Sequence, residues 1–451
     1  MSIIVNRLQY WAKVQPNHIA IVMDDTEYTY AMLWHMVKAS VTDGYILKSN
    51  AVASDASMTV IDSNTDISVK PHLEMENGVH LIESEYLLEQ CVAWLSDLAQ
   101  GIYPLVCHKN LSQERREAII DTCTRSDYII PEKANFGVLT SGTTGTPKIL
   151  WRSEQSWADF FDEQNKVFHI DKDTSMFVHG SFSFTGNMNM IIGVLWAGGT
   201  IVSTDSIMDR KWIQLMRNRA VSHVYMLPTK LRMILRHYKE TLDSVQYIIA
   251  GSQTLDQELL ENLKIAFPQM QFIVYYGASE LNYITWCTDE EWLKHPGTVG
   301  KPFDGVQIVE RDGLIYVDTP YGIEGIERPF TVHDRGYITD EGFLMFQGRQ
   351  GEVINRGGYK LYINEIEQAI QELNSVDQVV VIGIPDLLRG EEMVCYVVPK
   401  PTAPEEVVKQ DIHGRLIPAE RPKEIIYVSE IPLTDCAKVN KNLLKEWYNK
   451  K

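Results

Sequence analysis

The residues best suited to chemistry stand in one short run, Leu139-Thr-Ser-Gly-Thr-Thr-Gly-Thr-Pro-Lys148. Its glycines would let backbone N–H groups approach an anion, its hydroxyls add hydrogen-bond donors, and Lys148 adds a positive charge. These groups predict a phosphate-binding loop, although a flexible surface loop has a similar composition. The run is not a Walker loop, because that motif has Gly before the lysine and Ser or Thr after it, where Pro147 and Ile149 stand here.

Four segments further along the chain carry groups that could act on the same ligand: Tyr275–Glu280, Thr331–Tyr337, Gly348–Glu367 and Pro432–Lys441. An aromatic ring suits a purine, and a carboxylate such as that of Glu280 suits Mg²⁺. The two oxygens of Asp334 could accept hydrogen bonds from a pair of hydroxyls. Each segment also has a purely structural explanation, as a strand end, a turn or a solvated lysine.

Taken in order, these five segments resemble the motifs of the adenylate-forming superfamily, which includes acyl-CoA synthetases, adenylation domains and luciferases. The resemblance implies that the chain activates a carboxylic acid, fatty or aromatic, with ATP to form an acyl-adenylate. It implies that the acyl group then passes to the thiol of CoA. The implied cofactors are ATP, Mg²⁺ and CoA, with the phosphopantetheine of an acyl carrier protein as the alternative acceptor. A degenerate relative that binds nucleotide without turnover is a third interpretation.

The resemblance assigns the phosphate contacts to individual residues. In the loop they would be Thr140, Ser141, Gly142, Thr143, Thr144, Gly145 and Lys148. Tyr276 and Gly277 match the family's Tyr-Gly pair, and the tyrosine ring would stack on adenine. Ser279 replaces a threonine and keeps a hydroxyl for the phosphate. Glu280 would hold Mg²⁺ and is counted among the catalytic residues.

Four further residues would complete the nucleotide site in such a protein. Gly251 and Ser252 resemble the turn that lines the adenine pocket, and they would act through their backbone. Asp334 and Arg349 match the residues that contact the ribose. Next to them, His333 stands where the family has glycine.

The C-terminal segments imply a catalytic group that moves. Lys438 would be the catalytic lysine, which bridges the acid's carboxylate and the α-phosphate. Gly357 and Gly358 match the paired glycines beside which pantetheine passes in CoA ligases. Two departures are Gly351, at a hinge position that is usually Asp or Lys, and Ala437, in place of a glycine.

The segment His179–Asn187 lies where the family builds its acyl pocket. Amino-acid adenylation domains have a Phe-Asp pair there, whereas this chain has Phe184-Thr185. Because a buried ammonium group without a counter-charge is costly, the segment argues against an α-amino acid. Apolar side chains that could line an acyl pocket, but are more often plain core, are Met188, Met190, Trp196, Tyr225 and Met226.

These residues need a framework of strands and helices to position them. Between residues 135 and 350, short apolar segments alternate with helical ones, which predicts an α/β fold with a layered, mostly parallel sheet. Over the last hundred residues, a helix at Asn364–Glu372 and three strands predict a small α+β module. We therefore expect a large N-terminal domain of layered α/β sheets over 1–347 and a small mobile C-terminal domain over 348–451, with a hinge near 349–352.

The remaining features bound the partners and the compartment. The formal net charge is −18, from 60 acidic and 42 basic residues, which disfavours nucleic acid and anionic membrane surfaces as partners. Six scattered cysteines without a CxxC pair indicate reduced thiols in a cytoplasmic protein. Met1–Gln15 does not resemble a signal peptide, and the apolar stretch Met188–Val202 is too short and broken to span a bilayer, so we expect no integral membrane segment.

Overall fold

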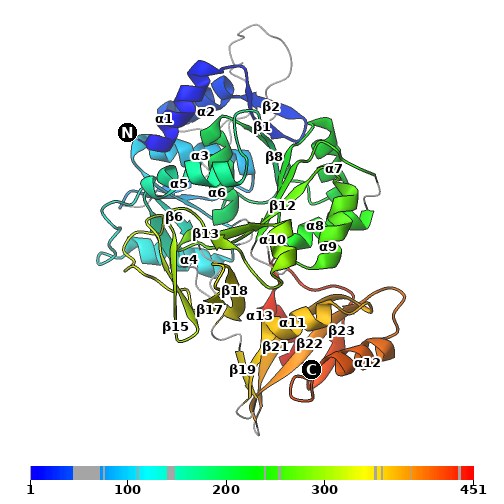
Figure 1. Ribbon diagram of the computed structural model, residues 1–451. Helices are drawn as coiled ribbons and strands as arrows, with labels where there is room; N and C mark the ends of the chain where they lie inside the picture. The colour runs from blue at the N-terminus through cyan, green and yellow to red at the C-terminus, as the bar shows by residue number, and fades with distance from the viewer. Residues whose placement is uncertain are drawn as a thin grey trace.

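The protein is described by a computed structural model, shown in Figure 1. The residues described are 2–43, 72–74, 77–108, 111–139, 148–237, 240–251, 255–349, 353–356, 359–386, 389–434 and 438–451. Within them, the chain builds three sheets in a large unit that ends with β18 and one sheet in a small unit, defined as β19 to the C-terminus.

A nine-stranded sheet forms the centre of the large unit, in the order β14-β13-β12-β11-β10-β8-β9-β1-β2. Its strands are β1 Ile19–Met23, β2 Thr26–Thr29, β8 Ser175–Val178, β9 Thr200–Ser203, β10 His223–Tyr225, β11 Tyr247–Gly251, β12 Gln271–Ala278, β13 Asn282–Thr288 and β14 Lys301–Pro302. The pairs from β12 through β11, β10, β8 and β9 to β1 are parallel, and the pairs at both edges are antiparallel. The predicted, mostly parallel arrangement is confirmed.

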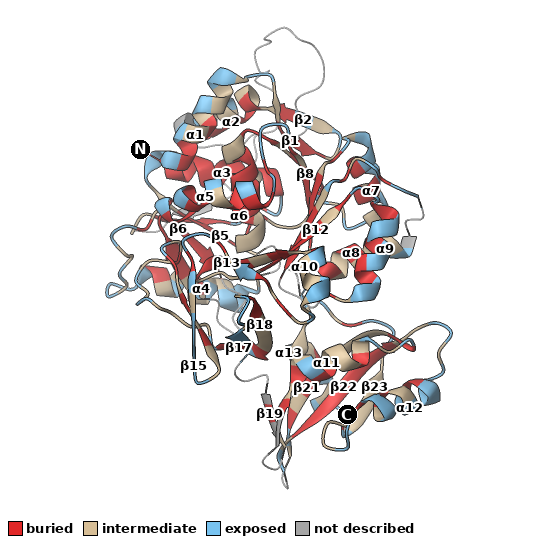
Figure 2. Ribbon diagram, in the orientation of Figure 1, coloured by how far each residue is buried: buried red, intermediate tan, exposed pale blue. Residues whose placement is uncertain are grey.

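Helices cover both faces of this sheet, so its central strands are apolar on both sides. One face packs against α7 Asp209–Asn218, α8 Pro228–His237 and α9 Gln257–Ala266. The other packs against α1 Ile3–Val14, α2 Tyr30–Asp43, α3 Leu87–Gln100, α5 Gln155–Val167 and α6 Thr185–Ala197. Figure 2 shows the resulting buried layer running through the middle of the large unit.

A second sheet carries the ends of the predicted phosphate loop. Its strands are β3 His72–Glu74, β4 Val79–Ile82, β5 Tyr103–Val106, β6 Phe136–Leu139 and β7 Ile149–Arg152, with α4 Gln113–Thr124 packed nearby. Strands β6 and β7 are antiparallel, and Leu139 faces Ile149 across the pair. The loop between them, 140–147, lies outside the described residues.

The third sheet of the large unit is antiparallel and carries two of the predicted ribose contacts. It consists of β15 Gln307–Arg311, β16 Leu314–Asp318, β17 Asp334–Ile338 and β18 Leu344–Arg349. A short helix, α10 Asp289–Lys294, begins with a capping box at Thr288 and Glu291.

The small unit is a five-stranded sheet with helices on both faces, drawn in orange to red below the large unit in Figure 1. Its elements are β19 Val353–Arg356, β20 Tyr359–Tyr362, α11 Ile363–Gln371, β21 Val376–Asp386, β22 Gly390–Pro399, α12 Glu405–Arg415, β23 Glu424–Tyr427 and α13 Lys441–Asn449. Along β21, Val381 faces the core under α11 and α12, while Val380 and Ile382 face the core under α13. This alternation has the period of two that a strand requires.

The predicted alternation of strands and helices between residues 135 and 350 and the small C-terminal module are confirmed. Between residues 40 and 130, the described residues form the end of α2 and then β3, β4, α3, β5 and α4. Helix α3 is buried over almost its whole length, including its polar residues Gln90, Ser96 and Asp97. The described cysteines Cys91, Cys107, Cys123, Cys287 and Cys395 are free and buried. Among the described residues, no helix is long and apolar enough to cross a membrane.

Candidate active site

The best-connected group among the predicted site residues is the carboxylate of Asp334, at the start of β17, which is only 2% exposed. The hydroxyl of Tyr276 donates a hydrogen bond to Oδ2 at 2.6 Å, and Nε of Arg349 donates to Oδ1 at 2.7 Å. Asp334 and Arg349 face each other across the β17–β18 pair, which brings their side chains together. Three residues from three separate motifs therefore meet at one carboxylate.

This contact fixes the orientation of the carboxylate and leaves acceptor capacity. A carboxylate has about four lone-pair positions, of which the two protein donors use two. Burial, followed by the neighbouring Asp334 charge, raises the pKa of Tyr276 well above its usual value. The phenol therefore stays protonated and remains a donor at neutral pH. Its ring also packs against Phe346, with the ring centroids 5.5 Å apart.

A tight hairpin turn between β12 and β13 presents Ser279 and Glu280. The pairing register shifts between Tyr276 and Gly277, and a Cβ at Gly277 would lie 2.6 Å from the carbonyl oxygen of Asn282. Glycine is needed there because any side chain would collide with that backbone. The Ser279 hydroxyl donates to the hydroxyl of Thr185, in the first turn of α6, at 3.2 Å. Glu280 follows Ser279 directly in the chain, and its side chain is half-buried.

Behind the hairpin turn lies a residue that the sequence analysis missed. Arg152, the last residue of β7, is fully buried. Its Nη2 donates to the carbonyl of Ser279 at 2.6 Å, and its Nη1 donates to the carbonyl of Tyr321 at 2.9 Å. Burial lowers the pKa of Arg152 to about 10, partly offset by Glu280 and Glu324, so it is charged at neutral pH. The feature of the sequence that could have revealed it is a charged residue at the end of an otherwise apolar strand.

The other predicted nucleotide contacts are placed in part. Gly251 ends β11, where a Cβ would lie 2.5 Å from the carbonyl oxygen of Tyr275, so this position requires glycine. Lys148 is exposed, directly before β7. The predicted contacts outside the described residues are Thr140, Ser141, Gly142, Thr143, Thr144, Gly145, Ser252, Gly357 and Gly358.

The predicted catalytic lysine belongs to the small unit, in a loop before α13. The loop is closed by a bridge between Leu433 and Val439. The backbone N–H of Thr434 donates to the carbonyl of Lys438 at 2.6 Å, and the N–H of Lys438 donates to the Thr434 hydroxyl at 3.3 Å. The side chain of Lys438 is exposed. Both hydrogen bonds are made by the Lys438 backbone, and among the described residues no hydrogen bond or ion pair joins the Lys438 side chain to Asp334. Gly351 and Ala437 lie outside the described residues.

Comparisons with known proteins agree with this geometry. The family model for the AMP-binding enzyme matches residues 131–322, and the model for the AMP-binding enzyme C-terminal domain matches residues 365–438. Together they match more than half of the chain. The chain belongs to the AMP-binding enzyme family.

Relatives of this AMP-binding enzyme support the assignment along the whole chain. It is 27% identical to an uncharacterized acyl-CoA ligase of Bacillus subtilis, YhfT, over 76% of this chain and 74% of that one. It is 22% identical to a putative long chain fatty acid-CoA ligase of Staphylococcus haemolyticus, VraA, over 99% of this chain and 98% of that one. The o-succinylbenzoate CoA synthetase of Bacillus subtilis, solved with an acyl-adenylate, has the same fold, with a TM-score of 0.79, 17% identity and 98% of both chains covered.

One departure of this AMP-binding enzyme from the family pattern has a physical explanation. His333, which stands where the family has glycine, has a φ of 63°. This left-handed conformation is the one that glycine adopts at no steric cost, and histidine is among the residues that tolerate it better than most. The backbone shape before Asp334 is thus kept although the residue differs.

The apolar residues considered for an acyl pocket do not form one. Met188, Met190 and Tyr225 lie in the core on the α6 side of the nine-stranded sheet, whereas Met226 lies in the core on the opposite side. Trp196 accepts hydrogen bonds at its carbonyl from Arg7 and Trp11 of α1. The plain-core interpretation therefore fits these side chains better.

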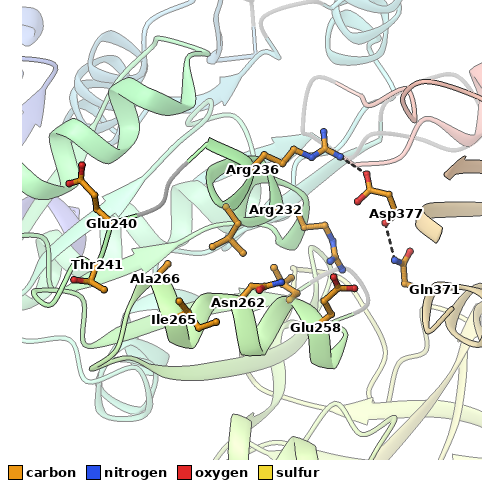
Figure 3. Close-up of a pocket in the computed structure, with 12 residues that line it drawn as sticks. Arg232, Arg236, Glu240, Thr241, Glu258, Asn262, Ile265, Ala266, Gln371 and Asp377 are labelled. Atoms are coloured by element: carbon orange, nitrogen blue, oxygen red, sulfur yellow. Dashed lines mark hydrogen bonds and ion pairs between the residues drawn. The ribbon is translucent and has the colours of Figure 1, made fainter. Parts of the chain in front are cut away.

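A cavity of about 330 Å³ lies between the two units of the AMP-binding enzyme, away from the predicted site residues. Figure 3 shows that α8 and α9 line one side and residues of the small unit the other. Across it, Arg236 donates to Asp377 at 2.8 Å. Lys400 forms a second ion pair between the units, with Glu258, at 2.9 Å. Because charged groups that line the cavity are already paired in this way, we interpret it as part of the interface between the units.

Proposed function

We propose that this AMP-binding enzyme activates a fatty or aromatic carboxylic acid with ATP and transfers the acyl group to CoA. The observation that carries the proposal is the meeting of Tyr276 and Arg349 at the buried carboxylate of Asp334. The acyl-CoA ligase names of the relatives support the reaction class. The uncharged Phe184-Thr185 pair, in place of Phe-Asp, supports an acid without an α-ammonium group.

The reaction brings two anions together, the carboxylate of the acid and the phosphates of ATP, and each site residue has a separate role in it. An oxygen of the acid attacks the α-phosphorus of ATP, the bond to the β-phosphate oxygen breaks, and pyrophosphate leaves. Tyr276 packs on adenine and Asp334 accepts from the ribose hydroxyls, which aligns the α-phosphate. Lys148 and its loop hold the leaving phosphates, and Lys438 balances the charge that develops between acid and phosphate. The CoA thiol then attacks the acyl carbonyl, and AMP departs.

Glu280 is the residue that would hold Mg²⁺. No group of three or more His, Cys, Asp and Glu side chains suited to a metal exists among the described residues. A single carboxylate fits Mg²⁺ nonetheless, because this ion usually takes one or two carboxylates and fills its other positions with phosphate oxygens and water. When bound, the ion supplies positive charge to the phosphates.

The two half-reactions need two arrangements of the chain. The boundary expected from the sequence, between 1–347 and 348–451, falls inside β18, which ends at Arg349. We therefore put the pivot near 349–352, between β18 and β19, so that Lys438 reaches the nucleotide for adenylation and withdraws for thioester formation. Gly351 at the pivot would permit a wide range of φ and ψ. The buried free thiols support a cytoplasmic location.

The proposal is tested by acid-dependent exchange of labelled pyrophosphate into ATP over a panel of acids. We expect exchange with fatty or aromatic acids and none with α-amino acids. A second assay offers the adenylate to CoA and to a phosphopantetheinylated carrier protein, with faster transfer to CoA expected. Absence of exchange with every acid would contradict the proposal and would favour a nucleotide-binding protein without turnover.

The Lys438→Ala variant tests the division into two half-reactions. We expect it to lose nearly all pyrophosphate exchange, because no other group then balances the charge between acid and α-phosphate. Thioester formation from supplied acyl-adenylate should remain near the wild-type rate. Lys445→Ala, which removes an exposed lysine from α13, is the matched control. Equal loss of both half-reactions in Lys438→Ala would refute the scheme.

A further inference from the structure

Arg152 is a fully buried, charged residue to which the proposed mechanism gives no role. Its guanidinium contacts two backbone carbonyls that lie 127 and 169 residues away in the sequence, those of Ser279 and Tyr321. Removing a guanidinium from water is costly, and a buried one is retained where several hydrogen bonds and counter-charges compensate it. Here the compensation comes from the hairpin turn that carries Glu280 and from the loop that carries Glu324.

The same three segments are joined by their backbones. The N–H of Ile323 donates to the carbonyl of Glu280 at 2.9 Å, and the N–H of Glu324 donates to the carbonyl of Trp151 at 2.8 Å. Strand β7, the Ser279–Leu281 turn and the loop at Tyr321–Glu324 therefore form a closed ring of contacts. Arg152 lies at its centre, since it is the one side chain bonded to both of the other segments among the hydrogen bonds of the described residues.

The fork of a guanidinium suits this task. It is planar, with donors that diverge in fixed directions, so it can hold two acceptors at a set separation. A lysine ammonium is a compact charge and cannot reproduce that spacing. Strand β7 also begins directly after the phosphate loop, with Lys148 four positions before Arg152. Strand β7 thus connects Lys148 to the turn that presents Glu280.

We propose that Arg152 is a positioning residue that fixes the Glu280 turn relative to strand β7, the strand that Lys148 directly precedes, so that Glu280 points at the Mg²⁺ carried by ATP. The inference rests on the proposed function, because Glu280 has a metal to meet only if the site takes ATP. It assigns Arg152 no contact with substrate. Groups that orient a metal ligand from behind commonly change metal affinity or activity by about 10- to 100-fold when removed.

Arg152→Met tests the proposal, with Arg125→Met as the matched control because Arg125 is an exposed arginine paired with Asp127. We expect Arg152→Met to raise the Mg²⁺ concentration for half-maximal pyrophosphate exchange by about tenfold or more, with the KM for the acid changed by less than about twofold. Arg152→Lys should fall between the wild type and Arg152→Met. Should Arg152→Met fail to fold, the Mg²⁺ dependence and the KM for the acid are measured on Arg152→Lys instead.

A second measurement does not depend on turnover. Hydrogen exchange at the amides of Ile323 and Glu324 reports on the ring of contacts, and we expect faster exchange there in the Arg152 variants than in Arg125→Met. The increase in melting temperature produced by ATP with Mg²⁺, compared with ATP and a chelator, should shrink in the same variants.

The two sets of results separate the two proposals. A folded Arg152 variant with wild-type Mg²⁺ dependence and wild-type amide protection would overturn the role of Arg152. A wild-type protein without exchange on any acid would overturn the proposed function, whereas the amide protection would still report on Arg152.

Discussion

At the scale of single residues, the site depends on how one carboxylate is held. Asp334 is buried and already accepts from Tyr276 and Arg349, so its orientation is set before any nucleotide arrives. Such preorganisation lowers the cost of binding, because the group need not be ordered by the ligand. Asp334 on β17 and Arg349 on β18 can meet because the two strands form an antiparallel hairpin that places them opposite each other.

The Asp334→Asn substitution tests this arrangement. It replaces one acceptor oxygen by an NH₂ group, which must face either a protein donor or a ribose hydroxyl. Loss of a hydrogen bond to a charged group costs about 1.5 to 3 kcal/mol, so we expect ATP to bind about 10- to 100-fold more weakly. Titration calorimetry measures the change. Asp340→Asn, at an exposed turn between β17 and β18, is the control, and equal ATP affinity in both variants would contradict the assignment.

At the scale of elements, β10 carries a buried histidine that makes the free energy of unfolding depend on pH. His223 is buried, its Nε2 donates to the carbonyl of His169 at 3.0 Å, and its ring stacks on Tyr247. Burial lowers the pKa of His223 from 6.5 to about 4. Between these values the unfolded chain binds the proton and the folded chain does not, so the free energy of unfolding falls as the pH falls from about 6.5 toward 4.

Urea unfolding at pH 7 and pH 5 measures this effect. The lowered pKa of His223 corresponds to a loss of roughly 2 kcal/mol between these two pH values. His223→Gln should be less stable than the wild type at pH 7, since it loses the stacked ring, but its stability should depend less on pH. His35→Gln, which changes an exposed histidine on α2, should keep the wild-type dependence. An unchanged pH dependence in His223→Gln would contradict the prediction.

The elements also show what the sequence could and could not reveal. The strands of the central sheet were predictable, because strands buried on both faces appear as short apolar runs. Tyr276, Asp334 and Arg349 were predicted to share a site, and they are in contact. Arg152 was missed because its two shortest hydrogen bonds are to backbone carbonyls. Every residue has a backbone carbonyl, so the sequence cannot show which ones a buried arginine contacts.

At the scale of the whole molecule, ion pairs cross from the large unit to the small one. Arg236 pairs with Asp377 and Lys400 pairs with Glu258, and all four side chains are partly exposed. Exposed pairs contribute only about 0.2 to 1 kcal/mol each and weaken as salt is added. The present arrangement of the two units should therefore be sensitive to ionic strength.

A double variant, Glu258→Gln with Asp377→Asn, tests this sensitivity. We expect the distance between fluorescent labels on the two units to change with salt in the wild type, and the variant at low salt to resemble the wild type at high salt. Glu240→Gln, whose ion pair with Arg217 lies within the large unit, is the control. A label distance in the wild type that does not respond to salt would contradict the prediction.

The weakness of these links has a consequence for how the enzyme would cycle. Ion pairs of this size are comparable to thermal energy, which is about 0.6 kcal/mol at room temperature. Thermal motion would then suffice to break these two ion pairs, and the proposed rotation of the small unit would need no energy from ATP at this point. On the proposed scheme, the chemical energy of the nucleotide would be left for the anhydride and the thioester, and the small unit would move between the two half-reactions by diffusion.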